Sequence, residues 1–162
     1  MKKSRVAFLG LFTAFAMILS FVESQIPTFV AIPGIKLGLP NIAIIIILYR
    51  FGWKEASIIS LLRVLLTSLL FGTVLSMLYS IAGAVLSLIV MILLKKFLST
   101  VTISVVGGVF HNVGQIAVAI LVTETQQLLF YLPVLIISGV IAGIVVGLVA
   151  ATAVSKIEKI EL

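Results

Sequence analysis

The stretch Pro33-Gly34-Ile35-Lys36-Leu37-Gly38-Leu39-Pro40-Asn41 breaks a sequence that is apolar almost everywhere else. Proline fixes φ and removes a backbone donor, so two prolines that flank glycines resist a continuous helix. Inside a bilayer such a segment leaves backbone groups unpaired unless it lines a cavity or lies at an interface. We therefore expect this stretch to form the outer lip of a small-molecule site in a membrane protein.

The composition is that of an integral membrane protein. The 162 residues are 62% hydrophobic and 10% charged, and the mean hydropathy is +1.41. A soluble domain usually has about a quarter of its residues charged, so this chain could not cover a water-facing surface. Because no polar stretch is long enough for a soluble domain, we expect residues 1–162 to form a single integral membrane domain.

The charge pattern argues against a nucleic-acid partner. The net charge is +6, but the basic residues lie at the ends of apolar runs, which is typical of membrane topology. Cysteine and aspartate are absent, and the 5 acidic residues are glutamates outside the apolar runs. Metal ligands are therefore scarce, and we expect neither a metal nor a cofactor.

Motifs for enzyme chemistry are also missing from the sequence. It has no glycine-rich phosphate loop followed by Lys-Ser/Thr, so we do not expect the chain to hydrolyse ATP itself. It has no aspartate-rich magnesium motif for prenyl diphosphates, and no intramembrane glutamate that could replace one. The expectation is a protein that is not an enzyme.

Hydropathy predicts an all-α membrane protein with six spans. A bilayer core of about 30 Å requires about 20 apolar helical residues. On that scale the spans are expected at residues 6–22, 40–51, 55–71, 74–94, 103–123 and 128–154. The second span is short, and residues 37–39 would extend it at the outer surface.

The basic residues orient this bundle, because cytoplasmic loops carry an excess of lysine and arginine. With the N-terminus inside, the cytoplasmic set is Lys2, Lys3, Arg5, Arg50, Lys54, Lys95, Lys96, Lys156 and Lys159. Only Lys36 is then outside, and only Arg63 lies within a span. Both termini are therefore predicted to be cytoplasmic in a multi-pass protein of the bacterial cytoplasmic membrane. The long loop at residues 23–40 is predicted to be extracellular, with room to fold back as a lid.

Arg63 is a charged residue inside a predicted span. It lies roughly 13 Å beyond Lys54 at 1.5 Å per residue, near mid-membrane, where a charge is costly and usually marks function. Its counter-charge is open between a bound anion, a backbone carbonyl, Glu23 and Glu124. Arg63 either contacts a ligand or has a structural role next to carbonyl groups or an aqueous vestibule.

The fifth predicted span carries His111, Asn112 and Gln115, one turn after Gly107 and Gly108. Residues three and four apart share a helix face, so we predict that the three polar side chains line one wall. Interhelical hydrogen bonding would explain one such residue, whereas three of them beside two glycines favour a ligand cavity. A single histidine without cysteine or aspartate is a poor metal site.

Other residues are expected to complete this cavity or to pack the helices. Tyr79 on the fourth span and Asn41 at the start of the second would close the cavity from its outer side. Small residues recur every four positions at Gly139, Gly143, Gly147 and Ala151. This spacing allows close helix approach and predicts packing within the bundle.

Several segments resemble the Gx transporter family, whose members are often labelled heptaprenyl diphosphate synthase component I. They are Pro33–Asn41, Phe51-Gly52-Trp53-Lys54-Glu55-Ala56, Leu62-Arg63-Val64-Leu65-Leu66, Leu78-Tyr79-Ser80-Ile81-Ala82-Gly83 and His111-Asn112-Val113-Gly114-Gln115. The resemblance covers nearly the whole chain.

That family is in turn similar to the substrate-binding S components of energy-coupling factor (ECF) transporters. The resemblance implies six helices, an extracellular-side site covered by the first long loop, and a small-residue motif on the first helix. In S components that motif is alanine, three residues, alanine, and it docks to a transmembrane coupling protein driven by two ATPase subunits. Here Ala7, Gly10 and Ala14 form the corresponding face.

The expected function is therefore capture of a small organic solute, such as a vitamin or cofactor precursor, for ATP-driven uptake. The substrate-binding residues would be Lys36, Asn41, Arg63, Tyr79, His111, Asn112 and Gln115. The first alternative is a membrane subunit of isoprenoid or quinone biosynthesis that binds a polyprenyl substrate. The second is a structural partner without a ligand, which tight packing of the His111 face would favour.

Overall fold

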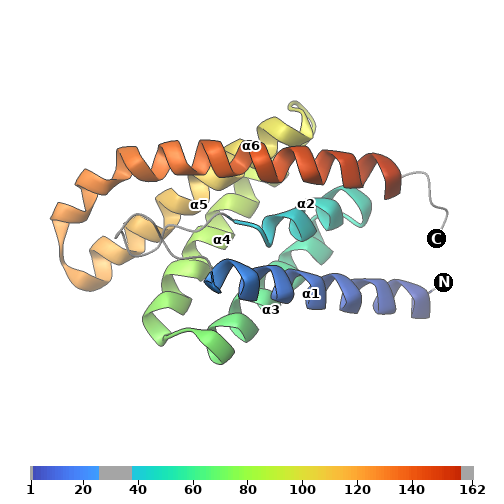
Figure 1. Ribbon diagram of the computed structural model, residues 1–162, viewed down its shortest axis with the longest axis horizontal. Coiled ribbons are helices and arrows are strands. Elements are labelled where there is room, and N and C mark those ends of the chain that lie inside the picture. Colours follow the sequence, from blue (N-terminus) through green and yellow to red (C-terminus); the bar gives the residue numbers. More distant parts are fainter. Residues whose placement is uncertain (1, 26–37, 158–162) are drawn as a thin grey trace.

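The computed structural model describes residues 2–25 and 38–157, and every regular element in them is a helix. The elements are α1 (Lys2–Gln25), α2 (Asn41–Arg50), α3 (Trp53–Phe71), α4 (Val74–Leu94), α5 (Thr100–Thr123), the 3-10 helix η1 (Gln126–Tyr131) and α6 (Leu132–Ile157). In Figure 1, α1 and α6 run along opposite sides of the bundle and α2 lies between them. The predicted all-helical fold is confirmed.

The fourth predicted span has the bounds of α4, and the first, third and fifth lie within α1, α3 and α5, which extend beyond them. The helix α2 is one residue shorter at each end than the second predicted span, and the sixth predicted span is divided between η1 and α6. The helix α5 begins at Thr100, where the Ser99 side chain accepts a hydrogen bond from the Thr102 N–H and caps the helix.

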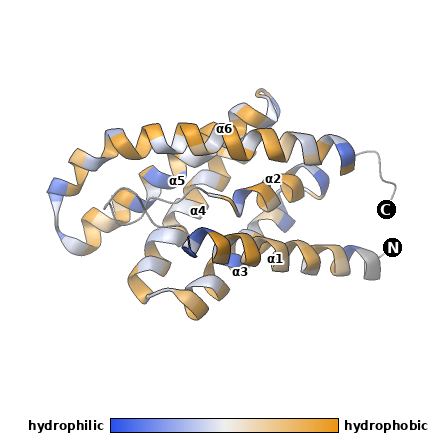
Figure 2. Cartoon of the chain, in the orientation of Figure 1, coloured by the Kyte–Doolittle hydropathy of each residue, from blue (hydrophilic) through white to orange (hydrophobic). Residues whose placement is uncertain are grey.

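Four helical segments are long and apolar enough to cross a membrane: Arg5–Gln25, Val74–Leu94, Thr100–Thr123 and Gln126–Ile157. Figure 2 shows hydrophobic residues along most of their length. By contrast, α2 has only 10 residues, or about 15 Å at 1.5 Å per residue. It is too short to cross a bilayer by itself.

The short helix α2 occupies the core of the bundle. Its residues Ile42 to Leu48 are all buried, so the apolar run is covered on every face. Lys95, at the end of α4, donates a hydrogen bond from Nζ to the Leu48 carbonyl at 2.6 Å. This bond satisfies one of the carbonyls that the last turn of α2 leaves without a helical partner. Partial burial lowers the pKa of the Lys95 ammonium.

Glycines set the distance between α5 and α6. A Cβ on Gly139, Gly143 or Gly147 would lie 3.0, 2.5 or 2.8 Å from the Cα atoms of Val109, Val105 and Val101, respectively. The two backbones are therefore in contact, and the predicted packing role of this four-residue repeat is confirmed. The interface between α4 and α5 is built in the same way, because a Cβ on Gly114 would lie 2.9 Å from the Cα of Gly83.

The α5–α6 contact gives a first test. Gly143→Ala should lower the thermal unfolding midpoint of the detergent-purified protein, because the added Cβ meets backbone that cannot rotate away; overpacking of this kind costs about 1–3 kcal/mol. Gly10→Ala is the matched control, since a Cβ there meets nothing within 4 Å. Equal midpoints for the two variants would contradict the close approach.

The cap on α2 gives a second test. Lys95→Met keeps the apolar stem but removes the donor to Leu48, and losing a hydrogen bond from a charged group costs about 1.5–3 kcal/mol. The control is Lys96→Met, because the neighbouring side chain is exposed. The free energy of unfolding in a denaturant titration should fall for the first variant only, and a similar loss for both would refute the cap.

Candidate functional site

The candidate site forms where α2 begins. The chain enters α2 through a turn in which Gly38 adopts φ +73°, a conformation that favours glycine, and the Asn41 N–H donates to the Gly38 carbonyl at 2.9 Å. The sequence predicts this stretch at the outer surface. Its described part, Gly38–Asn41, lies beside His111 and Asn112 near the middle of α5, and its position relative to the membrane surface stays a prediction. The start of α2 is thus deep in the bundle because the helix is only half a bilayer long.

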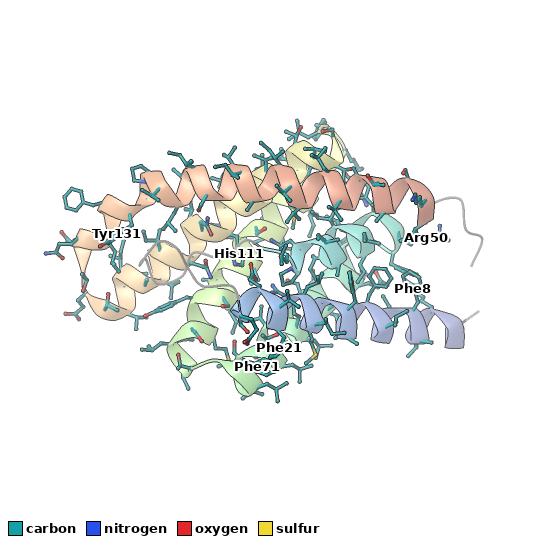
Figure 3. The ribbon with its side chains drawn as sticks, viewed as in Figure 1. Phe8, Phe21, Arg50, Phe71, His111 and Tyr131 are labelled. Carbon is teal, nitrogen blue, oxygen red and sulfur yellow. The ribbon has the colours of Figure 1, made fainter. Side chains whose placement is uncertain are left out.

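A small cavity lies at this point between α2, α5 and α6. Its lining residues are Gly38, Asn41, Ser104, Gly108, His111, Asn112, Gly139, Ala142, Gly143 and Val146. Figure 3 shows His111 midway between Tyr131 at one end of the bundle and Arg50 at the other. The cavity volume is about 10 Å³, which is roughly the room that one water molecule requires. The structure thus brings together Asn41, His111 and Asn112, three of the predicted binding residues.

Asn112 has a clear structural role at this site. Its side chain is 2% exposed, and Nδ2 donates to the Leu135 carbonyl at 2.8 Å on α6. Ser138 is a second, longer partner at 3.4 Å. Two roles were expected for the polar residues of α5, hydrogen bonding between helices and lining a ligand cavity. This bond is of the first kind. Both bonds use the Asn112 amide nitrogen and neither uses its side-chain oxygen.

His111 and Gln115 face α4 instead of α6. A Cβ on Gly83 would lie 3.1 Å from His111 Cε1 and 2.8 Å from Gln115 Cγ. His111 therefore lies between α4 and the cavity, whereas Gln115 packs on α4 and does not line the cavity. The Gln115 Oε1 atom is buried and has no hydrogen-bond partner among the described residues. The three polar residues of α5 thus do not share one wall.

Arg63 is buried, but it does not line the cavity. Arg63 forms no ion pair with any described residue, and the field of Glu23 reaches it without direct contact; its counter-charge therefore stays a prediction.

Two other predicted residues lie apart from the cavity. Tyr79 is half-buried in the second turn of α4 and does not line the cavity. Lys36 falls outside the described residues.

Ser104 was missed by the sequence analysis. It is 4% exposed, it lines the cavity, and its hydroxyl has no hydrogen-bond partner among the described residues. Its spacing of seven residues before His111 places both on one helix face, which is the signal that could have found it. With Asn41 and His111, it gives the cavity hydrogen-bonding groups from two helices. Among the described residues, no group of three or more His, Cys, Asp or Glu could hold a metal ion.

The face formed by Ala7, Gly10 and Ala14 lies on the outside of α1. All three residues are exposed, and a Cβ on Gly10 would meet no atom within 4 Å. The opposite face of α1 packs on the bundle through Ala16 and Ser20, which are buried. The small-residue face is therefore open to a lipid or to another protein.

Comparison with known proteins identifies the family. The family model for heptaprenyl diphosphate synthase component I matches residues 12–153, a range that includes α2 to α5 in full and most of α1 and α6. No curated protein and no solved structure matches the chain. Since the family match covers most of the sequence, the chain belongs to the heptaprenyl diphosphate synthase component I family.

Proposed function

We propose that the protein is a substrate-binding membrane subunit, similar to the S components of ECF transporters, that captures a small organic solute such as a vitamin or cofactor precursor. The observation that carries this proposal is the short helix α2. It begins deep in the bundle, beside a cavity lined by Asn41, Ser104 and His111. Broken helices that begin at mid-depth beside polar side chains are typical of solute sites in transporters.

The proposal includes six helices in one membrane domain, with both termini in the cytoplasm. Two contacts support the parallel course of α1 and α3 that this topology requires. Arg5 forms an ion pair with Glu55 near the start of both helices, and Phe21 packs on Phe71 near their ends, with ring centroids 5.1 Å apart. Figure 1 also shows the start of α1 and the end of α6 at the same end of the bundle.

Uptake against a gradient needs energy that this chain has no motif to supply. We propose that a transmembrane coupling protein and ATPase subunits bind the face formed by Ala7, Gly10 and Ala14. The exposure of this face supports the assignment, because small side chains let a partner helix approach closely.

A second candidate function follows from the family description. It is a membrane subunit of isoprenoid or quinone biosynthesis that binds a polyprenyl substrate and recruits a soluble synthase. The name of the family favours it directly. A polyprenyl chain needs a long groove that is open to lipid, whereas the cavity between α2, α5 and α6 has room for about one water molecule, so either ligand would require the cavity to widen.

Ligand binding tests the proposal and separates the two candidates. Native mass spectrometry of the purified protein should detect a bound small molecule. His111→Ala should raise the dissociation constant about tenfold, the effect of losing roughly one buried hydrogen bond, and so lower the occupancy. The control is Thr123→Ala, at the exposed end of α5. Unchanged occupancy in the His111 variant would refute the site, and a polyprenyl mass would favour the second candidate.

Partner binding is tested at the small-residue face. Ala14→Trp should abolish co-purification of the coupling protein and ATPase subunits from membranes, because the ring fills the space into which a partner helix packs. Leu69→Trp places the same ring on α3 at a position that is 77% exposed and should leave the complex intact. If neither variant changes co-purification, α1 is not the docking helix.

A further inference from the structure

The turn that joins α3 to α4 differs in composition from the other turns between described helices. It consists of Gly72 and Thr73, between the end of α3 and the start of α4. At or beside each of the other turns there are charged side chains, namely Arg50, Lys54, Lys95, Lys96 and Glu124. By contrast, residues 64–94, which include the α3–α4 turn, contain no charged residue.

Large apolar side chains on both sides of this turn are exposed. Leu69 is 77% exposed and Val74 is 71% exposed, and Leu70, Phe71 and Leu75 are exposed as well. The one polar side chain in residues 69–75 is that of Thr73. An apolar surface of this kind is unfavourable in water and indicates contact with a membrane or a partner.

The backbone of the turn is satisfied by partners within the hairpin itself. The Gly72 N–H donates to the Ser68 carbonyl at 3.0 Å, and the Thr73 N–H donates to Ser76 Oγ at 2.9 Å. The Ser76 N–H donates in return to Thr73 Oγ1 at 3.2 Å, which makes a capping box. Backbone groups in hydrocarbon must have partners in the protein. The N–H groups of both turn residues meet this condition without water.

The length of α3 fits a turn that lies inside the bilayer. The helix begins at Trp53, an exposed aromatic residue beside Lys54, as is typical of a membrane–water interface. Its 19 residues cover about 28 Å at 1.5 Å per residue, slightly less than a hydrocarbon core of about 30 Å. The 24 residues of α5 cover about 36 Å. In Figure 1 the α3–α4 turn does not extend as far along the bundle as the connection between α5 and α6.

We propose that the α3–α4 turn lies inside the bilayer, below the phosphates of one leaflet, and that lipid acyl chains cover the apolar side chains of residues 69–75. Lipid fits this surface because it carries no charge and its one polar side chain, Thr73, is used in the cap. The placement does not depend on solute capture. Only the identity of the leaflet as the outer one rests on the proposed topology.

Thiol labelling tests the placement, since the chain has no cysteine of its own. Val74→Cys puts a single thiol at the turn, and the matched control Gln127→Cys puts one at an exposed position in η1. Both full-length variants are reconstituted in phosphatidylcholine vesicles, with a charged maleimide on both sides of the membrane. The thiol at residue 74 should react roughly ten times more slowly, because an apolar environment withholds the reactive thiolate. Equal rates would overturn the proposal.

A second measurement distinguishes lipid from a protein that covers the turn. The same two thiols are labelled with a membrane-permeant bimane, and the vesicles are made with lipids that are brominated on their acyl chains. Bromine quenches a fluorophore on contact, so the fluorescence at residue 74 should fall far more than that at residue 127. Slow maleimide labelling without this quenching would show that a second copy of the chain or another protein covers the turn, and would overturn the proposal.

Leu75→Cys is the second variant, in case Val74→Cys does not fold, because Leu75 is exposed next to Val74. The same slow labelling and strong quenching are expected, and rapid labelling would overturn the proposal. Neither measurement needs a solute or a coupling protein. Rapid labelling in a protein that still binds a small molecule would reject the buried turn and leave solute capture standing.

Discussion

A helix that ends inside an apolar bundle must have partners for its terminal backbone groups, because no water reaches them in hydrocarbon. The helix α2 meets this constraint at both ends. At its start, the first N–H groups of α2 donate to the carbonyls of Gly38, Leu39 and Pro40, and Glu23 of α1 accepts the Gly38 N–H in the preceding turn. At its end, Lys95, which follows α4, donates to the Leu48 carbonyl, and the Phe51 and Gly52 N–H groups donate to Ile47. Two neighbouring helices therefore hold the short one in place, and the polar groups at its start stay deep in the fold.

The backbone contact between α5 and α6 keeps the cavity small and limits how it can open. Gly139 and Gly143 line it, and the same glycines bring α6 into backbone contact with α5. Separating α5 from α6 would break that contact and the bond from Asn112 to Leu135.

Hydropathy and residue spacing predicted the helices and the packing role of the Gly139 to Gly147 repeat, since both depend on local pattern. The depth at which a helix begins in the bundle could not be predicted from local pattern. The ten apolar residues of α2 resemble a short span, and only the surrounding helices show that it begins halfway through the bundle. The Asn112 partner is 23 residues away, and Glu23, which the sequence offered only as a possible counter-charge for Arg63, accepts the N–H of Gly38. Such pairings depend on how helices pack.

The two groups of polar residues at the start of α2 differ in charge, and this difference bears on the ligand. Toward α5 and α6 lie uncharged groups of Ser104 and Asn112, with His111 beside them. The cation is Arg63 of α3, already in the field of Glu23. A diphosphate carries several negative charges that proteins usually neutralise with magnesium and carboxylates, and one shared arginine would leave most of that charge buried and unpaired. The described polar groups around the start of α2 therefore supply little positive charge for a diphosphate.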